Sequence, residues 1–348
     1  MTQPPSPLTM LLSRHTRRRN FTIGLLLAAA ARAVRAQEPA KQHRIAIVIS
    51  TGPVTRVYDP TSHAFQAFWQ ELHRLGDAEG QNLIVDLYSG EGRPEGFADL
   101  AREVVRGSPE VIVAIAGSIT SAISAATDTI PIVASGTYPS SGVLPNLGRP
   151  GGNMTGVRVE EPEIYGKRLQ ILKEAIPSAS KIAYLDIRTF WDSASGREAR
   201  EELDKASQIL GVSLTDMLVE ESSAPEYQRV FREIAPRQPD AIIVSGTSEL
   251  FPYRKLIVDL AEKSHLPAIY AFRDYVEAGG LMAYETDLAE LFRRMADDVH
   301  QILNGANPGD IPIYQPTKFE FLINLKAAKA LGLTLPPMLL ATADEVIE

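Results

Sequence analysis

Residues 110–136, EVIVAIAGSITSAISAATDTIPIVASG, contain one complete strand–helix–strand unit. Residues 110–117 and 130–136 are short apolar runs rich in β-branched residues, which is typical of buried strands. Residues 118–127 between them favour a helix. A helix between two such strands indicates a parallel pair with a right-handed crossover. The stretch therefore predicts a doubly wound α/β sheet with helices on both faces.

The same alternation extends in both directions from this unit. Upstream lie two strands and two helices, predicted at 43–50, 62–75, 82–89 and 94–106. Downstream a second series of helices alternates with strands at 181–187, 213–219, 240–246 and 267–272. A chain of 348 residues is long enough for two domains that each bury a core. We therefore expect two similar α/β lobes in series. The residues after 279 cannot be assigned to either lobe from this pattern.

A glycine-rich stretch, GRPGGNMTG at 148–156, separates the two series. Its glycine spacing matches neither common phosphate-binding loop, and the next predicted helix begins too late for such a loop. Asn153-Met154-Thr155 fits the glycosylation sequon, which is short and frequent by chance. Because glycine absorbs large changes in backbone angles, we interpret the stretch as an interdomain crossing. A passive surface loop is the alternative.

The first 36 residues are typical of an export signal. Arg14 and Arg17–Arg19 form a basic region, residues 23–31 are apolar and uncharged, and residues 34–36 offer a small-residue cleavage site. The apolar run is about half the length of a membrane-spanning helix, so an uncleaved anchor is the weaker reading. Arg18-Arg19-Asn20-Phe21 resembles a twin-arginine signal, and ordinary Sec export remains the alternative.

Composition narrows the possible partners. The chain has no cysteine, which excludes disulfides, thiolate metal sites and a lipid-modified N-terminal cysteine. Residues 1–36 hold six arginines and no acidic residue, so cleavage near Ala36 changes the net charge from −8 to −14. Such an acidic protein is not expected to bind nucleic acid or anionic lipid. We expect a protein that diffuses freely in the periplasm.

Small hydroxyl residues and glycines follow the predicted strands of the first lobe. Ligands of open α/β sheets bind outside the carboxyl ends of the strands, and hydroxyl and helix N-terminal N–H groups suit a carboxylate. The alternative is that these side chains only cap helices. The candidate residues are Ser50, Thr51, Gly117, Ser118, Ser135, Gly136, Thr137 and Tyr138, the tyrosine as a ring that stacks on a ligand.

The equivalent strand ends of the second lobe carry charged and aromatic residues. Arg273 is a candidate for binding an anionic group and Asp186 for an ammonium group, although each could instead form a structural ion pair. Trp191 could stack on a ligand or pack on its own lobe. The acidic pair Glu160-Glu161 is interpreted as two solvated charges before a helix N-terminus, where they interact favourably with the helix dipole. The candidates here are Asp186, Arg188, Trp191, Ser245, Thr247, Phe272, Arg273 and Asp274.

The sequence offers no pattern typical of catalysis or metal binding. The six histidines are scattered without ligand spacing, and no G-x-S-x-G motif is present. We therefore predict no catalytic residue, no metal and no cofactor. An exported hydrolase or transferase on the same fold remains the alternative function. A DNA-binding regulator would need an N-terminal helix-turn-helix, where this chain has the export signal.

Several long blocks resemble one family, the ABC-transporter substrate-binding proteins of the tryptophan/tyrosine type. They include residues 79–105, 130–157, 166–185 and 266–348, within a resemblance that runs from about residue 44 to the end. It implies a type I periplasmic binding protein: two α/β lobes joined by three hinge crossings, near 156–160, 281–287 and 312–318. Lobe one would be 44–157 plus 285–314, and lobe two 158–283 plus 315–348.

The resemblance implies a monomeric solute receptor. It would close on an amino acid or an aromatic or other organic carboxylate and deliver it to an ABC permease in the inner membrane. One segment departs from the family: TGPVTRVYDPTSHAF, 51–65, is longer than the family's usual turn after the first strand. Because that loop overhangs the cleft, the ligand could differ from a simple aromatic amino acid.

Overall fold

A five-stranded parallel sheet forms the centre of lobe one in the computed structural model, which describes residues 42–136 and 146–348. Its strand order is β2-β1-β3-β4-β5. The strands are β1 (His43–Ile49), β2 (Leu83–Ser89), β3 (Val111–Ile115), β4 (Ile132–Gly136) and β5 (Met154–Arg158). Every neighbouring pair is parallel, as the strand–helix alternation predicts.

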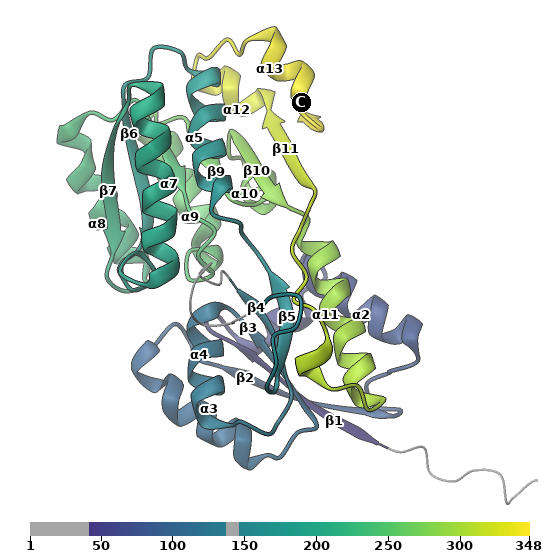
Figure 1. Ribbon diagram of the computed structural model, residues 1–348. Coiled ribbons are helices and arrows are strands. Elements are labelled where there is room, and N and C mark those ends of the chain that lie inside the picture. Colours follow the sequence, from purple (N-terminus) through teal and green to yellow (C-terminus); the bar gives the residue numbers. More distant parts are fainter. Residues whose placement is uncertain (1–41, 137–145) are drawn as a thin grey trace, which may run out of the picture. The chain divides into compact units, whose positions relative to one another are not determined.

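Helices cover both faces of this sheet (Figure 1). One face packs against α2 (His63–Leu75) and α11 (Leu288–Leu303), and the other against α3 (Phe97–Arg106) and α4 (Gly117–Ala126). Short 3-10 turns, η1 (Val54–Tyr58), η2 (Pro94–Gly96) and η5 (Pro308–Asp310), lie in the connections. Alternate residues of β1 belong to the cores on opposite faces of the sheet. Ile45 and Ile47 pack with α2 and α11, whereas Ala46 and Val48 pack with α3 and α4.

Local sequence explains where α2 begins and ends. Phe65, Phe68 and Leu72 recur at helical spacing and are buried in the core of lobe one. The Ser62 hydroxyl accepts a hydrogen bond from the Phe65 N–H and so caps the N-terminus. Gly76 follows the last turn with φ of 97°, a left-handed conformation that suits glycine. These caps place the N-terminus of α2 just after the long loop that leaves β1.

Lobe two is built on a seven-stranded sheet of order β12-β11-β10-β9-β8-β6-β7. All its pairs are parallel except β10 with β11. The strands are β6 (Lys181–Ile187), β7 (Ser213–Val219), β8 (Ala241–Val244), β9 (Ala268–Tyr270), β10 (Met282–Thr286), β11 (Phe319–Asn324) and β12 (Glu345–Ile347). The C-terminal residues that the strand–helix pattern leaves unassigned thus complete this sheet.

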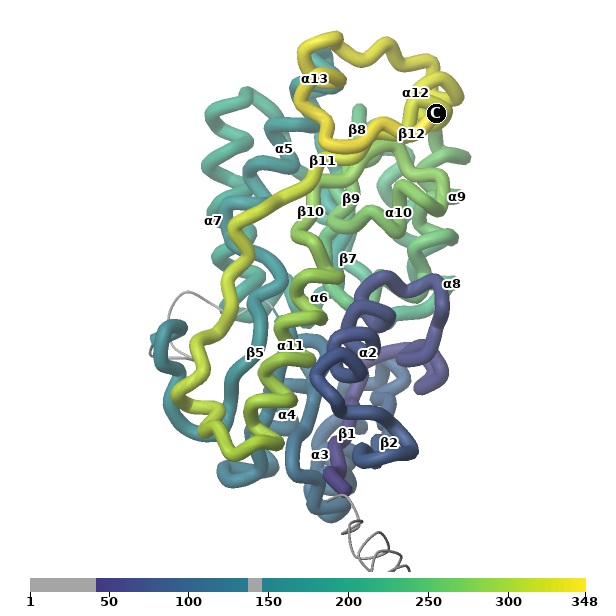
Figure 2. Tube along the Cα trace, turned by 90° about the vertical axis from the view of Figure 1, so that its right-hand side faces the viewer, coloured from purple at the N-terminus to yellow at the C-terminus, as the bar shows by residue number. Residues whose placement is uncertain are grey.

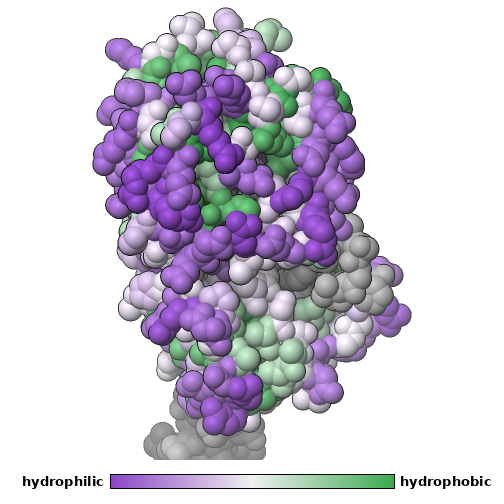
Figure 3. Space-filling model, turned by 90° about the vertical axis from the view of Figure 1, so that its left-hand side faces the viewer, coloured by the Kyte–Doolittle hydropathy of each residue, from purple (hydrophilic) through white to green (hydrophobic). Residues whose placement is uncertain are grey.

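The second sheet is also covered on both faces. One core includes residues of α5 (Glu163–Ala175), α7 (Ala194–Leu210), α12 (Leu325–Ala330) and α13 (Pro337–Thr342), together with the short α6 (Arg188–Trp191). The other includes residues of α8 (Ala224–Ile234), α9 (Arg254–Lys263) and α10 (Arg273–Glu277), with η3 (Ala235–Arg237) and η4 (Phe251–Tyr253) in the connections. Viewed from the side of α7 and α8, the surface is largely hydrophilic (Figure 3).

Three segments carry the chain between the sheets (Figures 1 and 2). The chain leaves sheet one after Arg158, returns after Thr286 and crosses again between Tyr314 and Phe319. The Thr286 hydroxyl donates to the Val159 carbonyl at 2.8 Å, and the Arg158 N–H donates to the Tyr314 carbonyl at 2.8 Å. The first crossing is therefore hydrogen-bonded to the other two.

The glycine-rich stretch does not form the crossing that its composition predicts. Residues 148–153 are a turn in lobe one, and residues from Met154 onward belong to β5. A Cβ at Gly156, where φ is 136°, would lie 2.0 Å from the Ala134 carbonyl oxygen, so the close approach of β4 and β5 requires glycine here. The crossing begins only after β5 ends.

Candidate ligand site between the lobes

The carboxyl ends of strands from both sheets meet at a small group of polar side chains. Ser50 follows β1 in lobe one, and its hydroxyl lies 3.2 Å from the hydroxyl of Ser248, which follows β8 in lobe two. Ser118, in the first turn of α4, donates to Glu249 Oε1 at 3.0 Å, and Ser248 donates to Glu249 Oε2 at 2.8 Å. We call Ser50, Ser118, Ser248 and Glu249 the interlobe polar cluster.

The cluster is held firmly on the lobe-two side. The carbonyl of Glu249 accepts hydrogen bonds from the hydroxyls of Ser222 and Tyr227, the latter at 3.1 Å. The Glu249 residue is only 7% exposed. No described Lys, Arg or His forms an ion pair with its carboxylate. A buried carboxylate therefore faces hydroxyl groups from both lobes without a cation from the described residues.

The other predicted residues of lobe one are buried strand ends. Thr51 is 5% and Ser135 3% exposed. The Ser135 carbonyl accepts from the Ala116 N–H, and the Gly136 carbonyl accepts from the Val159 N–H at the first crossing. Gly117 opens α4 and so positions Ser118. Thr137 and Tyr138 lie outside the described residues.

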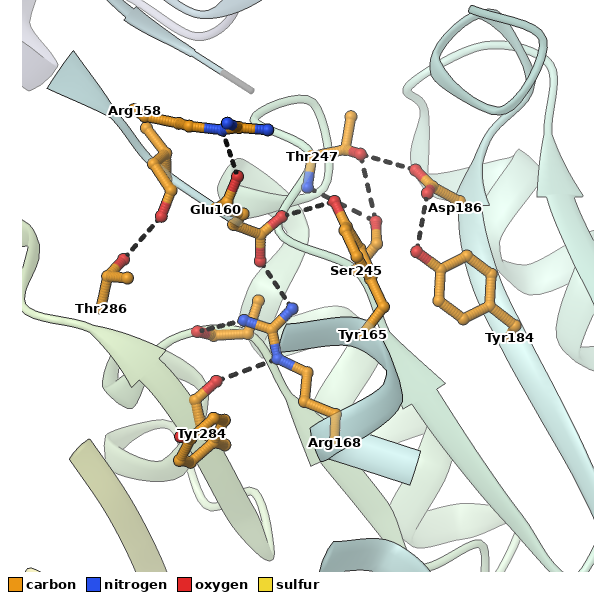
Figure 4. Close-up of polar contacts among 12 residues, drawn as sticks. Arg158, Glu160, Tyr165, Arg168, Tyr184, Asp186, Ser245, Thr247, Tyr284 and Thr286 are labelled. Atoms are coloured by element: carbon orange, nitrogen blue, oxygen red, sulfur yellow. Dashed lines mark hydrogen bonds and ion pairs between the residues drawn. The ribbon is translucent and has the colours of Figure 1, made fainter. Parts of the chain in front are cut away.

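Asp186, Ser245 and Thr247 are linked within lobe two (Figure 4). The Asp186 carboxylate is fully buried and accepts from the Thr247 hydroxyl at 2.6 Å and the Tyr184 hydroxyl at 3.1 Å. The Ser245 hydroxyl donates to Thr247 at 3.1 Å. Burial raises the pKa of Asp186 to about 7, against the opposing effect of these hydrogen bonds. The network joins the ends of β6 and β8.

Arg188 and Trp191 make their contacts inside lobe two and away from the cluster. Arg188 forms an exposed ion pair with Glu220 at 2.8 Å. Trp191 is 3% exposed, and its ring stacks on Tyr184 with centroids 4.9 Å apart, so it packs on its own lobe. The structure does not bring these two side chains together with Ser50 and Ser118.

Arg273 and Asp274 border a separate pocket of about 220 Å³. Arg273 contacts Glu285 at 3.3 Å and Glu345 at 2.7 Å, which supports the ion-pair reading of this residue. Phe272, the residue before them in the chain, is buried. Burial raises the pKa of Asp274, against the opposing charge of Arg254. The pocket is lined by Ser62, His63, Ala64, Phe251, Arg273, Asp274, Glu285, Asp287, Leu288, Ala289, Arg293 and Glu320.

A buried ion pair that the sequence pattern does not predict lies at the first crossing. The expectation that Glu160 is solvated is wrong. It is 2% exposed, and its carboxylate accepts from Arg168 at 2.6 Å and from the Tyr165 hydroxyl at 2.9 Å (Figure 4). Arg168 also donates to the carbonyls of Tyr284 and Ala271. The sequence carried one signal: Arg168 falls on the apolar face of α5, four residues after Ile164.

A second missed pair precedes it. Arg158, 3% exposed, contacts Glu161 at 3.1 Å. Among the described residues, Arg158 Nη2 and Glu161 Oε1 find no hydrogen-bond partner although both atoms are buried. Burial raises the pKa of Glu161, against the opposing charge of Arg158. Charged groups of both signs therefore lie where the first crossing leaves lobe one.

The described residues set limits on other roles. No three His, Cys, Asp or Glu side chains there are grouped in a way that could hold a metal ion. None of the helices in residues 42–136 and 146–348 is both long and apolar enough to cross a membrane. The polar groups described above can bind a small ligand through hydrogen bonds and charge.

The chain is similar in sequence to substrate-binding proteins. The family described as ABC transporter substrate binding protein matches residues 58–347. A tyrosine-binding protein of Clostridioides difficile (strain R20291) is 23% identical over 274 residues, which span 78% of this chain and 76% of that protein. These relatives are substrate-binding proteins rather than enzymes.

Solved structures agree on the fold. A conserved domain protein from Vibrio cholerae is 26% identical, with a TM-score of 0.77. The match covers 88% of this chain and all of that one. An ABC domain from Streptococcus pneumoniae, solved in complex with L-Trp, is 22% identical with a TM-score of 0.76 and the same coverage. With two parallel-sheet lobes of the type I periplasmic binding protein fold and a family match over most of its length, the chain belongs to the ABC transporter substrate binding protein family.

Proposed function

We propose that this protein is the exported receptor of an ABC importer. It closes its two lobes on a small organic ligand, an amino acid or an aromatic or other organic carboxylate, and delivers that ligand to a permease in the inner membrane. The interlobe polar cluster carries the proposal, because Ser50 and Ser118 from lobe one and Ser248 and Glu249 from lobe two converge on one place. A ligand bound there contacts both lobes.

Contact with both lobes is what a receptor of this kind needs. A ligand shifts the balance between open and closed forms only through its preference for the closed one. A ligand that contacts polar groups of both lobes at once has that preference. Predicted residues at the same strand ends, Thr51, Gly117, Ser135 and Gly136, border the cluster along the chain and are proposed to complete the lobe-one wall.

The cellular setting is proposed from the N-terminal segment and the family. Cleavage near Ala36 would release an acidic protein into the periplasm, where it acts as a monomer. The L-Trp in the Streptococcus pneumoniae structure and the name of the Clostridioides difficile relative support amino acids as the first ligands to examine.

The test is a binding screen of residues 37–348. The protein is refolded to remove carried-over ligand, and thermal unfolding is followed with amino acids, aromatic acids, sugars and nucleosides. A midpoint that rises with ligand concentration is expected for amino acids or organic acids, with hits confirmed by calorimetry. X-ray scattering should show compaction on binding. Absence of saturable binding across the screen would contradict the receptor assignment.

A further inference from the structure

The pocket of about 220 Å³ beside the second crossing is lined by both lobes. The N-terminal parts of α2 and α11 form its lobe-one side, and α10, β10, β11 and η4 form its lobe-two side. Glu285, the penultimate residue of β10, lines this pocket next to the point where the chain crosses to lobe one. Rotation of one lobe against the other about this crossing therefore changes the space around Glu285.

Glu285 is buried and only partly compensated by a cation. It is 2% exposed, its Oε2 accepts from the backbone N–H of Arg273 at 2.6 Å, and its Oε1 lies 3.3 Å from Arg273 Nε. That nitrogen is buried and finds no hydrogen-bond partner among the described residues. The guanidinium donates instead to Glu345 at 2.7 Å and lies 3.9 Å from Glu320, which stands opposite Glu285 in the pairing of β10 with β11. One guanidinium is therefore shared by three carboxylates.

The closed pocket favours a protonated Glu285. Burial raises the pKa of Glu285 to about 8, against the opposing hydrogen bond and charge of Arg273. Ionisation adds a negative charge close to Asp274 and Glu320. The charged and titratable groups around the pocket, from all the elements that pack there, are Arg56, His63, Arg254, Arg273, Asp274, Glu277, Asp287, Arg293, Glu320 and Glu345.

Separation of the lobes changes the surroundings of Glu285. A wider pocket lets water reach the carboxylate, so the pKa of Glu285 falls toward its ordinary range in the open form. The form with the higher pKa binds the proton more tightly, so closure is favoured most at low pH and loses that advantage as the pH rises through about 8. Burial also raises the pKa of Asp186 and of Asp298, but Asp186 makes its hydrogen bonds within lobe two and Asp298 lies in α11 of lobe one.

We propose that the pocket beside the second crossing is a proton-linked switch of lobe closure, in which a neutral Glu285 favours the closed form and an ionised Glu285 favours the open one. The inference goes beyond the proposed receptor function and does not depend on which ligand is bound. A contact of 3.4 Å between His63 and Glu277 also joins α2 to α10, but both side chains are about half exposed, so this pair contributes little.

Two fluorescent labels test the switch in residues 37–348. Because the chain has no cysteine, Ser121→Cys on α4 and Gln228→Cys on α8 provide one exposed labelling site on each lobe, on the side of the molecule away from α2 and α11 (Figure 1). Energy transfer between the labels is measured from about pH 6 to about pH 9, in the free protein and with L-tyrosine or L-tryptophan added. The ratio of closed to open forms should fall about 5-fold or more between about pH 6.5 and about pH 8.5.

Substitutions assign this change to Glu285. Glu285→Gln keeps the size and the hydrogen bond from the Arg273 N–H but cannot ionise, so the ratio should stay at its low-pH value throughout. Glu320→Gln leaves Arg273 shared by one carboxylate fewer. It should move the midpoint about half a pH unit lower, and it covers the case that Glu285→Gln fails to fold. Asp298→Asn, which removes a carboxyl group whose pKa is also about 8, and His63→Gln should both retain the pH dependence.

Two kinds of result would overturn the switch. One is a ratio that is the same at every pH, or a pH dependence that persists in Glu285→Gln. The other is a pH dependence that disappears in Asp186→Asn, Asp298→Asn or His63→Gln. Neither result would remove the receptor function, which the binding screen tests separately.

Discussion

Gly246 lies directly against the carboxylate of Glu160. A Cβ at this position would lie 2.5 to 2.7 Å from three carboxylate atoms of Glu160. Those atoms are held by Arg168 and Tyr165, so they cannot withdraw without breaking a buried ion pair. Gly246→Ala should lower the free energy of unfolding by about 1–3 kcal/mol, measured in urea, because a methyl group overpacks this site.

Gly96 provides the matched control for this substitution. Its Cβ would meet no heavy atom within 4 Å, so Gly96→Ala should change stability by less than about 0.5 kcal/mol. Equal effects of the two substitutions would show that Gly246 is not constrained by the carboxylate of Glu160.

Asp298 should make stability depend on pH. It lies in α11, its Oδ2 atom is buried without a partner among the described residues, and burial raises its pKa to about 8. A carboxyl group whose pKa is higher in the folded than in the unfolded state binds its proton more tightly when folded. Its contribution is therefore complete at low pH and is lost as the pH rises from about 4 to about 8.

Asp298→Asn should remove that loss. Relative to the unsubstituted protein, the variant should gain about 2 kcal/mol or more at pH 8 and progressively less toward pH 4. Urea unfolding at a series of pH values measures this difference. Asp204→Asn, an exposed site on α7, should show no such trend. A constant offset at every pH would contradict a raised pKa at Asp298.

Side-chain roles at single residues were the least predictable part of the site. The sequence places Ser50 and Ser118 at strand ends, and both reach the cluster. The sequence does not predict that the Trp191 ring stacks on Tyr184, because this contact depends on the path of the chain through α6. Glu249 was missed because it lies five residues beyond β8, where the loop path rather than the strand decides its direction.

Elements were predicted well where local signals define them. The predicted helix at 62–75 is observed as His63–Leu75, with Ser62 and Gly76 as its caps. β11 could not be placed from the strand–helix pattern, because its antiparallel pairing with β10 joins residues far apart in sequence. The prediction for the glycine-rich stretch was wrong for the same reason. Residues 154–156 form a strand because they pair with β4, which is distant in sequence.

Thr286 tests how far the crossings depend on each other. Its hydroxyl, fully buried at the end of β10, donates to the Val159 carbonyl of the first crossing. Thr286→Val preserves shape but leaves that carbonyl unpaired, so the free energy of unfolding should fall by about 1–3 kcal/mol. Thr286→Ser keeps the hydroxyl and should retain more of the stability. If the serine variant is the weaker of the two, the methyl group rather than the hydrogen bond matters.

At the scale of the whole molecule, the long loop after β1 joins the lobes. Arg56, in η1 of that loop, lies over the ring of Phe251 in lobe two, 4.5 Å from its centroid. Burial lowers the pKa of Arg56 to about 10, so the side chain remains charged at neutral pH. Together with the interlobe polar cluster, this cation–π contact favours approach of the lobes before any ligand binds.

Arg56→Ala should therefore shift the ligand-free protein toward separated lobes. Loss of a contact worth about 1 kcal/mol lowers the ratio of closed to open forms roughly fivefold, and apparent ligand affinity falls by up to the same factor. Arg254→Ala is the matched control, because Arg254 covers the same ring at 4.9 Å from within lobe two. X-ray scattering of the free protein should show a larger radius of gyration for Arg56→Ala alone, with ligand restoring compaction. Equal expansion in Arg254→Ala would contradict this prediction. It would show that packing of the Phe251 ring inside lobe two, rather than its contact with Arg56, sets the balance between open and closed forms.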